Sequence, residues 1–577
     1  MGDLEKQVEH REYSHSERPS TFMSATYEIG PNTHRDDHGS SNSSDPFGIE
    51  RYSTSMSEVS TSSQASSNHL KRSLKSRHLA MISLGGTIGQ GLFLSSGTNL
   101  SQGGPGGALI AYAIIGFIAF WVTYSLGEMA TYIPISGSFT IYCRRFVDES
   151  FGTTIGYNYW ACWAVIVSTE LVALPFIMGF WTDVVPDWAW SGIWLLVIFC
   201  VNLFGARSYG ETEYWFSLIK ILTVVIFIIF GCLVSAGLVN HTTYGFKFWH
   251  DPGAFPNGAQ SVIDALVLAS FSMQGTEIVG ITAGEAGNPT KEVPRAIKNV
   301  VWRILIFYLC SVFVMGMVIS CDDLHLLQTD TSKAEVSDVT TVSPFTLVFQ
   351  KGGLESVAHI MNAVILITVL SCANSGLYVA SRTLLALSEE GYAWHKLSYI
   401  SGRGVPVYSV ICTSLVSLIA FATSFIPGKS LFQVLTTLSG VSGLLTWLGI
   451  CIAHYRFRKA FKVQGRDLSE LPMRAPCFPF GDLFDIVACT AITLMTGYKS
   501  FYPPNAVGLT GHYLGVIFTV IGFFALKFYT RSHIVPLEDI DLDTGRSEFS
   551  TLEISKGKTM EGTWLRRILK RIYIIIS

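Results

Sequence analysis

Charged residues are scarce in this chain. Asp, Glu, Lys and Arg make up 14% of its 577 residues, against about a quarter in soluble domains, whereas hydrophobic residues make up 49%. This balance excludes an ordinary soluble globular protein and predicts a chain that crosses a membrane several times. The formal net charge of −3 gives no indication of a nucleic-acid partner, and we expect none.

Motifs for metal binding and catalysis are also missing. The eleven cysteines are scattered, with no CxxC pair and no cluster of Cys and His, so we expect buried thiols without a disulfide framework or a metal. No HExxH sequence occurs, and the histidines lie mainly in tails and loops. We therefore expect neither an enzyme nor a cofactor, and no cleavable signal peptide.

Two polar tails flank the hydrophobic part of the chain. Residues 1–76 are rich in Ser and too poor in apolar residues to form a core, which predicts a disordered tail. Lys6 lies there beside Ser and acidic residues, which is compatible with ubiquitin-ligase machinery acting on the tails. Residues 531–577 end in WLRRILKRIYIIIS, which predicts either a helix on the inner leaflet or a flexible tail.

Residues 77–530 contain about twelve hydrophobic segments, each near the ~20 residues that a membrane-spanning helix needs. They lie near 78–98, 107–133, 155–181, 189–205, 214–238, 261–284, 298–320, 357–385, 406–426, 432–454, 481–502 and 511–530. Basic residues precede the first segment and recur in every second loop, which predicts that both termini are cytosolic. Asn240 begins a glycosylation sequon in a predicted outer loop, although chance occurrence is the alternative.

The first hydrophobic segment is interrupted by glycine. Residues 79–98 read LAMISLGGTIGQGLFLSSGT, with Gly85, Gly86, Gly89 and Gly91 in the middle. Each glycine inside a helix costs roughly 1 kcal/mol relative to alanine, so four within seven residues predict a break. Inside a membrane, unwound backbone is tolerated only where protein or a wet cavity covers it, so a break predicts a binding cavity. A nucleotide-binding glycine loop and close helix packing are the alternative interpretations.

The sixth segment is interrupted by polar residues in a similar way, at Ser270, Ser272, Gln274, Gly275, Thr276 and Glu277. Paired breaks five segments apart indicate an inverted repeat with a site at the membrane midplane. We therefore expect an all-α integral membrane fold of 5+5 spans, with the first and sixth helices broken, followed by two further spans. The freed main-chain groups would bind the carboxylate and the amine of a small solute.

Four ionisable side chains lie within predicted spans: Glu277, Glu170, Lys220 and Glu128. A charge at the bilayer centre costs at least ~2.5 kcal/mol, so such groups pair with each other or line a transport route. Buried carboxylates and lysines can also exchange protons near neutral pH, and we assign proton coupling to Glu277, Glu170 and Lys220. The alternatives are a hydrogen-bonded structural carboxylate for Glu170 and a side chain that reaches the membrane surface for Lys220. For Glu128 we favour a structural role.

Two further residues are candidates for the wall of the cavity. Phe271 directly precedes the second break, where an aromatic side chain can close over a solute, with ordinary packing as the alternative. Ser439 lies in the tenth segment, in the string LSGVSG, and either contributes to the cavity or hydrogen-bonds a neighbouring helix.

Strings along nearly all of residues 75–530 resemble the fungal plasma-membrane amino-acid permeases of the amino acid–polyamine–organocation superfamily. They include LKSRHLAMISLGGTIGQGLFL, LGEMATYIPISGSF, NLFGARSYGETEYWFSLIK, FSMQGTEIVGITAGEAGNPTKEVPRAIKNVVWRI and CIAHYRFRKAFKVQGR. The resemblance implies the 5+5+2 fold and proton-coupled uptake of L-amino acids by alternating access. The expected partners are an L-amino acid, a proton and the lipid bilayer, and the expected location is the plasma membrane.

By position, the resemblance assigns substrate binding to the main chain of Thr87, Gln90, Gly91, Phe271 and Gln274. It assigns an aromatic gate to Phe271, a brace between the first and eighth spans to Lys220, and proton coupling to Glu277.

Gln90 replaces the Thr that is usual in relatives, and Met273 replaces a usual aromatic. The strings SMQGTE and TEYW favour basic substrates, arginine and lysine. A broad-range or neutral amino-acid permease and a sensor with little transport are the alternatives, whereas a channel would lack the paired breaks.

Overall fold

A computed structural model of the protein describes residues 81, 88–135, 137–182, 184–204, 206–239, 241–284, 288–326, 342–502, 504 and 506–546. Several predictions fall outside these ranges and stay predictions. They concern the tail over 1–76, Thr87, the sequon residue Asn240 and the amphipathic segment after residue 560.

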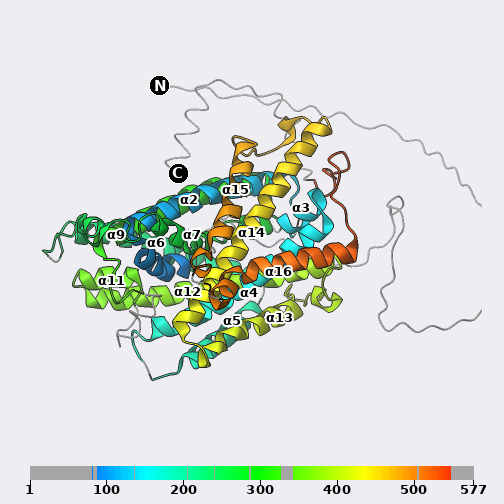
Figure 1. The fold of residues 1–577 in the computed structure, drawn as a ribbon. Coiled ribbons are helices and arrows are strands. Elements are labelled where there is room, and N and C mark those ends of the chain that lie inside the picture. Colours follow the sequence, from blue (N-terminus) through cyan, green and yellow to red (C-terminus); the bar gives the residue numbers. More distant parts are fainter. Residues whose placement is uncertain are drawn as a thin grey trace, which may run out of the picture. The chain divides into compact units, whose positions relative to one another are not determined.

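Every regular element in the described ranges is a helix (Figure 1). The first half comprises η1 (Gly91–Ser95), α2 (Ser96–Tyr132), α3 (Phe139–Phe146), α4 (Glu149–Met178), α5 (Asp187–Asn202), α6 (Ala206–Ser235) and η2 (Trp249–Gly253). The middle comprises α7 (Gln260–Met273), α8 (Ile278–Ala283), α9 (Pro289–Val318), α11 (Pro344–Lys351) and α12 (Glu355–Glu389). The last part comprises η3 (His395–Ser398), α13 (Val407–Ser417), η4 (Leu418–Ser424), α14 (Gly428–Val463), η5 (Leu468–Glu470), α15 (Phe480–Met495), η6 (Tyr498–Ser500) and α16 (Ala506–Thr530).

Nine helical segments in the described part of the chain are long and apolar enough to cross a membrane. Two shorter apolar helices, Asp187–Asn202 and Leu305–Val318, lie where the fourth and seventh spans are predicted. Over the described ranges the fold is therefore all-helical, as predicted, and its apolar helices are consistent with a multi-pass membrane protein. The count of twelve spans and the inverted repeat stay predictions.

The helix continues through the connection predicted between the first two spans. Residues 91–132 form one helical run, which kinks at Gly104, where φ is +64°, just before Pro105. A side chain at Gly104 would lie 2.4 Å from Pro256, so glycine is needed both for the backbone angle and for the close approach. The Gly106 N–H donates a hydrogen bond to the Ala254 carbonyl at 2.9 Å, which holds the kink against the segment before α7.

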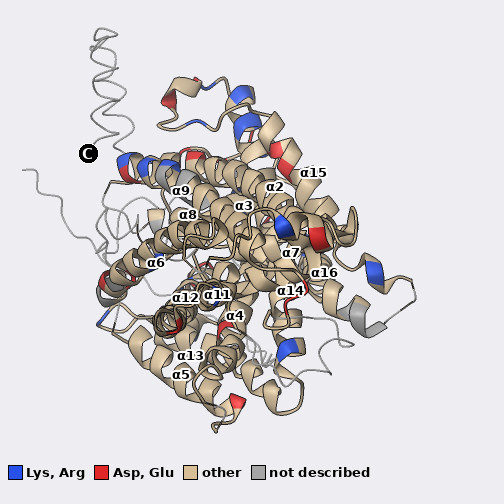
Figure 2. Cartoon of the chain, turned by 90° about the vertical axis from the view of Figure 1, so that its left-hand side faces the viewer, with Lys and Arg blue, Asp and Glu red and all other residues tan. Residues whose placement is uncertain are grey.

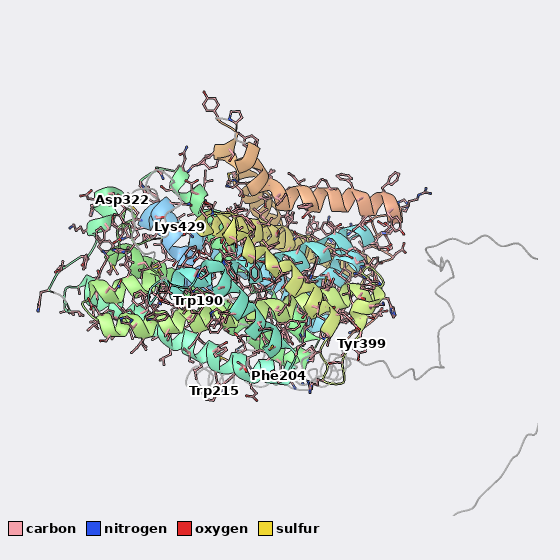
Figure 3. All side chains as sticks on the ribbon, turned by 90° about the horizontal axis from the view of Figure 1, so that it is seen from below. Trp190, Phe204, Trp215, Asp322, Tyr399 and Lys429 are labelled. Carbon is pink, nitrogen blue, oxygen red and sulfur yellow. The ribbon has the colours of Figure 1, made fainter. Side chains whose placement is uncertain are left out.

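Helix α4 lies at the centre of the fold and packs against α3, α5, α12, α13, α14 and α16. Its surroundings are protein, whereas α6 and α16 present apolar side chains outward, as expected for helices that face lipid. Figure 3 labels Phe204 and Trp215 at the periphery, and both side chains are more than half exposed. Lys, Arg, Asp and Glu are sparse along the described helices (Figure 2).

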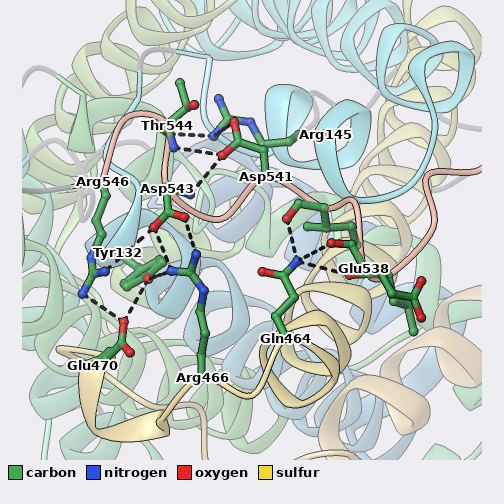
Figure 4. Close-up of polar contacts among 12 residues, drawn as sticks. Tyr132, Arg145, Gln464, Arg466, Glu470, Glu538, Asp541, Asp543, Thr544 and Arg546 are labelled. Atoms are coloured by element: carbon green, nitrogen blue, oxygen red, sulfur yellow. Dashed lines mark hydrogen bonds and ion pairs between the residues drawn. The ribbon is translucent and has the colours of Figure 1, made fainter.

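The first part of the predicted C-terminal tail packs against the ends of helices (Figure 4). Residues 531–546 form this strap. Gln464 Nε2 donates to the Ile540 carbonyl at 2.8 Å, and Arg466 pairs with Asp543. The hydrogen bond from Arg466 holds the pKa of the Asp543 carboxyl below its usual range. The strap thus ties the chain after α16 to the end of α14.

Candidate functional site

The interruption in the sixth hydrophobic segment is present in the structure. Helix α7 ends at Met273, Gln274 is extended with φ −62° and ψ 155°, and the helix resumes as α8 at Ile278. Gly275 between them has φ +94°, a conformation that residues with a side chain rarely adopt. Within the sequence MQGTE, the helix therefore ends at the extended Gln274, and Gly275 provides the left-handed conformation that follows.

The first segment also departs from helical geometry before η1. Ile88 and Gly89 form a bend, and η1 begins after Gln90, while residues 82–87 lie outside the described part. The Gly89 carbonyl accepts a hydrogen bond from the Leu92 N–H at 3.1 Å. A Cβ atom at Gly89 would lie 2.3 Å from Cys372 Sγ on α12, so any side chain here would require the Cys372 side chain to move.

The two interrupted segments touch at Gly91 and Ser272. A Cβ atom at Gly91 would lie 2.5 Å from the Ser272 Cα, so only a glycine allows the two main chains to come this close. Ser272 Oγ lies 2.9 Å from the Gly91 carbonyl and accepts a 2.9 Å hydrogen bond from the Tyr112 hydroxyl. The Tyr308 hydroxyl donates to the Ser272 carbonyl at 2.7 Å. Helices α2 and α9 thus hold the start of η1 beside the end of α7.

Gln274 connects the second break to α14. Its Nε2 donates to the Ser439 carbonyl at 2.6 Å, and its Oε1 accepts from Cys162 Sγ at 3.4 Å. Two polar atoms of the predicted site residues are buried without a hydrogen-bond partner among the described residues, Gln90 Nε2 and Ser439 Oγ. A buried polar atom that forms no hydrogen bond in the protein is costly, so these atoms are available to a ligand or to water.

Glu277 is buried and accepts hydrogen bonds from several directions. Its carboxylate oxygens lie 3.2 Å from the Gly275 N–H, 3.3 Å from the Tyr159 hydroxyl and 3.2 Å from Trp447 Nε1. None of the ion pairs found among the described residues includes Glu277. The carboxylate thus joins the break to α4 and α14 through neutral donors.

Glu170 lies beside the first break. The side chain is only 2% exposed, and its Oε1 is 3.8 Å from the position that a Cβ at Gly89 would occupy. Its Oε2 is buried and has no hydrogen-bond partner within the described ranges. One oxygen of this carboxylate, Oε1, therefore lies beside the bend at Gly89, and the other, Oε2, has spare hydrogen-bonding capacity.

Lys220 does not reach the membrane surface. The side chain is 1% exposed, and its Nζ lies 3.5 Å from Glu213 Oε1, two turns earlier on α6. Glu213 Oε2 in turn accepts a 2.8 Å hydrogen bond from the Ser371 hydroxyl of α12. The alternative in which Lys220 extends to the lipid–water boundary is wrong, because a buried carboxylate of its own helix provides a partner.

Removal of Lys220 alone should strongly destabilise the protein. In Lys220→Met the Glu213 carboxylate would stay buried without its cation, which costs about 3–5 kcal/mol. The double variant Lys220→Met/Glu213→Gln removes both charges and keeps a partner for Ser371, so it should unfold close to the wild-type temperature. Thermal unfolding in detergent measures both. A single variant as stable as the double variant would show that the pair is not energetically coupled.

A cavity of about 310 Å³ lies near the start of α7. The distribution of basic residues among the loops predicts that this end of α7 faces the outside of the cell. Its wall includes Val267 and Leu268, one turn before Phe271, and Thr437 of α14. Lys499 Nζ lies 2.5 Å from Asp264 Oδ2 at this cavity, which joins η6 to α7. Phe271 itself is 6% exposed and lies one turn after these wall residues on α7, just before the second break.

The structure brings most of the predicted site residues together. Gly91 meets the end of α7 at Ser272, and Gln274 meets Ser439. Gln90 directly precedes Gly91, and its Oε1 accepts a hydrogen bond from the Ser95 hydroxyl at 3.3 Å. The main chain is less free than the sequence suggests, because the Gly91 carbonyl already accepts from Ser272 and the Phe271 carbonyl from the Gln274 N–H at 3.3 Å.

Sequence reasoning missed several partners of these residues. They are Tyr112, Tyr308, Cys162, Tyr159, Trp447 and Glu213. The seven-residue spacing within one helix could have identified Glu213 as the partner of Lys220. The other partners come from distant segments.

Apolar helices that surround buried polar groups at interrupted segments are typical of a membrane transport protein. A model of the amino acid permease family matches residues 78–537. A similar protein is the lysine-specific permease LysP of Escherichia coli, which is 42% identical over 81% of this chain and 95% of its own length. The lysine-specific permease of Saccharomyces cerevisiae is 37% identical over 87% of this chain and 83% of its own length. The general amino-acid permease GAP1 of S. cerevisiae is 39% identical over 83% of this chain and 81% of its own length. The chain belongs to the amino acid permease family. It is a multi-pass membrane transporter and not an enzyme.

Proposed function

We propose that this permease takes up L-amino acids together with protons across the plasma membrane, with a preference for lysine and arginine. One observation carries the proposal: the start of the η1–α2 run lies against the end of α7 at Gly91 and Ser272. A helix start carries a partial positive charge and a helix end a partial negative charge. The start of η1 therefore suits the carboxylate of a zwitterionic amino acid, and the end of α7 suits its ammonium group.

The direction of transport follows from the predicted topology. We propose that both tails are cytosolic and that the cavity beside Asp264 is the entrance from outside. The amino acid passes Phe271, which closes over it, and the interrupted helices then move with α2 and α9 to open the other side. Glu277 binds the proton, because the group lies at the break and its hydrogen-bond partners are all neutral donors.

Glu170 supports the preference for basic substrates. Its buried carboxylate has an oxygen without a hydrogen-bond partner among the described residues and lies beside the bend at Gly89. A lysine or arginine side chain supplies a cationic donor for that oxygen, whereas a neutral side chain leaves it unpaired. Two of the similar proteins carry the name lysine-specific permease, which supports the same preference.

The preference is tested by uptake of labelled lysine, with unlabelled amino acids as competitors, in cells that lack their own permeases. Wild-type uptake should be displaced best by lysine and arginine. Glu170→Gln should weaken lysine binding about tenfold or more, because a charge-assisted hydrogen bond contributes about 1.5–3 kcal/mol.

The control for this test is Glu355→Gln, which changes an exposed carboxylate at the start of α12 and should behave as wild type. Unchanged selectivity in the Glu170 variant would contradict the assignment of that residue. Lysine binding without any uptake by the wild type would instead indicate a sensor.

A further inference from the structure

A second group of buried ionisable residues lies away from the breaks, between α2, α14 and α15. We call it the His454 cluster and define it as Glu128, His454, Arg458 and Asp482. The side chains of Glu128 and His454 are fully buried, and those of Asp482 and Arg458 are 3% and 8% exposed. The transport route proposed above uses none of them.

The imidazole of His454 lies between two carboxylates. Its Nδ1 is 2.8 Å from Asp482 Oδ2 on α15, and its Nε2 is 3.4 Å from Glu128 Oε2 on α2. A neutral imidazole has one N–H and one lone pair, so one of these contacts would set a lone pair against a carboxylate. Only the imidazolium form has a hydrogen on both nitrogen atoms, so the position of the imidazole between two carboxylates favours the proton-bound form.

The charges in the cluster balance only when His454 carries its proton. Arg458 Nε lies 2.8 Å from Glu128 Oε1 and compensates that carboxylate. The imidazolium then compensates Asp482, which also accepts a 2.8 Å hydrogen bond from the Ser125 hydroxyl of α2. Loss of the proton would leave an uncompensated negative charge in the protein interior, which is costly.

Other titratable groups on the neighbouring helices contact different partners. Asp485 of α15 is 3.6 Å from Cys451 Sγ, and Cys143 of α3 donates to the Gly449 carbonyl. Glu277 at the second break reaches α14 at Trp447, two turns before His454. The rings of Phe457 and Phe478 cover the imidazole. Within the described ranges, Glu128 and Asp482 are therefore the carboxylates in contact with His454.

The cluster joins a helix that moves in the proposed transport cycle to helices outside the moving set. Glu128 belongs to α2, which moves with the breaks, whereas His454 and Asp482 belong to α14 and α15. Glu128 also accepts the Ala475 N–H at 2.6 Å, from the chain between α14 and α15. All these contacts lie on the side that the basic residues at the end of α14 predict to be cytosolic.

We propose that His454 is a second proton-binding site, which holds the cytosolic side closed when protonated and lets it open when the proton leaves to the cytosol. This inference rests on the proposed transport function. The bound proton attracts Glu128 and Asp482 to one imidazolium and so fixes α2 against α14 and α15. After deprotonation, Asp482 has no counter-charge and repels Glu128, so only the Arg458 ion pair and the Ala475 hydrogen bond still hold Glu128, and α2 separates more readily.

The test is the rate of lysine exchange in oriented proteoliposomes, measured against the pH on the cytosolic side at constant outer pH. The wild-type rate should rise with cytosolic pH, by up to about tenfold per pH unit, the limit for one proton. His454→Gln, neutral at every pH, should lack this rise of the exchange rate with cytosolic pH. His454→Arg, charged at every pH, should lack the rise as well and exchange more slowly.

Asp485→Asn serves as the matched control, because it changes a carboxylate of the same helix that does not contact the imidazole, and it should keep the wild-type response. A His454 variant that keeps the wild-type pH response would overturn the inference. If neither His454 variant is recovered as monodisperse protein, Asp482→Asn decides, with a flat response expected and a wild-type response as refutation. A wild type that does not exchange lysine would contradict the proposed function itself.

Discussion

Glu277→Gln is expected to lose the accumulation of lysine against its gradient. A glutamine side chain keeps the shape of Glu277 but cannot bind or release a proton at any accessible pH. In proteoliposomes with an inward proton gradient, one proton per substrate permits up to about tenfold accumulation per pH unit. The accumulation ratio of the variant should fall to about one, which is equilibration without concentration.

The same experiment separates coupling from damage to the fold. Exchange of internal for external lysine does not require net proton movement, so a folded Glu277→Gln protein should still exchange. Glu355→Gln provides the exposed-carboxylate control and should accumulate lysine as the wild type does. Wild-type accumulation by Glu277→Gln would exclude Glu277 as the coupling group, and Glu170 would be the next residue to test.

Gly91→Ala should abolish most lysine binding, although it adds a single methyl group. The added Cβ would lie 2.5 Å from the Ser272 Cα, and main chain cannot rotate away as a flexible side chain can. Separating the helix start from the α7 end would also break the 2.9 Å contact between Ser272 Oγ and the Gly91 carbonyl. Overpacking of this kind costs about 1–3 kcal/mol, so binding should weaken by roughly tenfold or more.

Binding of labelled lysine to purified protein measures this effect, and the unfolding temperature shows whether the variant is intact. Gly402→Ala is the matched control, because a Cβ there would meet no atom within 4 Å. The control should bind lysine as tightly as the wild type. Equal affinity in the Gly91 variant would mean that the close approach of the two interrupted segments does not form the site.

Local sequence signals predicted the breaks but not their surroundings. The bend at Gly89 and the left-handed Gly275 follow from glycine chemistry within a few residues, so a sequence window is enough to locate them. The partners of Ser272 come from Tyr112 and Tyr308, whose positions depend on how whole helices pack. No local pattern indicates which helices face each other.

The His454 cluster could not be predicted from the sequence for the same reason. Glu128 precedes Asp482 by more than three hundred residues, and each looks unremarkable alone. Glu128 was expected to have a structural role, which its contacts with Arg458 and the Ala475 N–H support. The kink at Gly104 was not predicted, because the sequence GGPGG around it is typical of a loop and lies between the first two predicted spans. The structure instead has helix on both sides of the kink.

The most direct test is an experimental structure of the permease with lysine bound. We predict that the α-carboxylate and α-amine of lysine lie between the start of η1, at Gly89 to Gly91, and the end of α7, at Phe271 to Gln274, with the side-chain ammonium at Glu170. Lysine bound only in the outer cavity near Asp264, with both interrupted segments closed into continuous helices, would contradict the account.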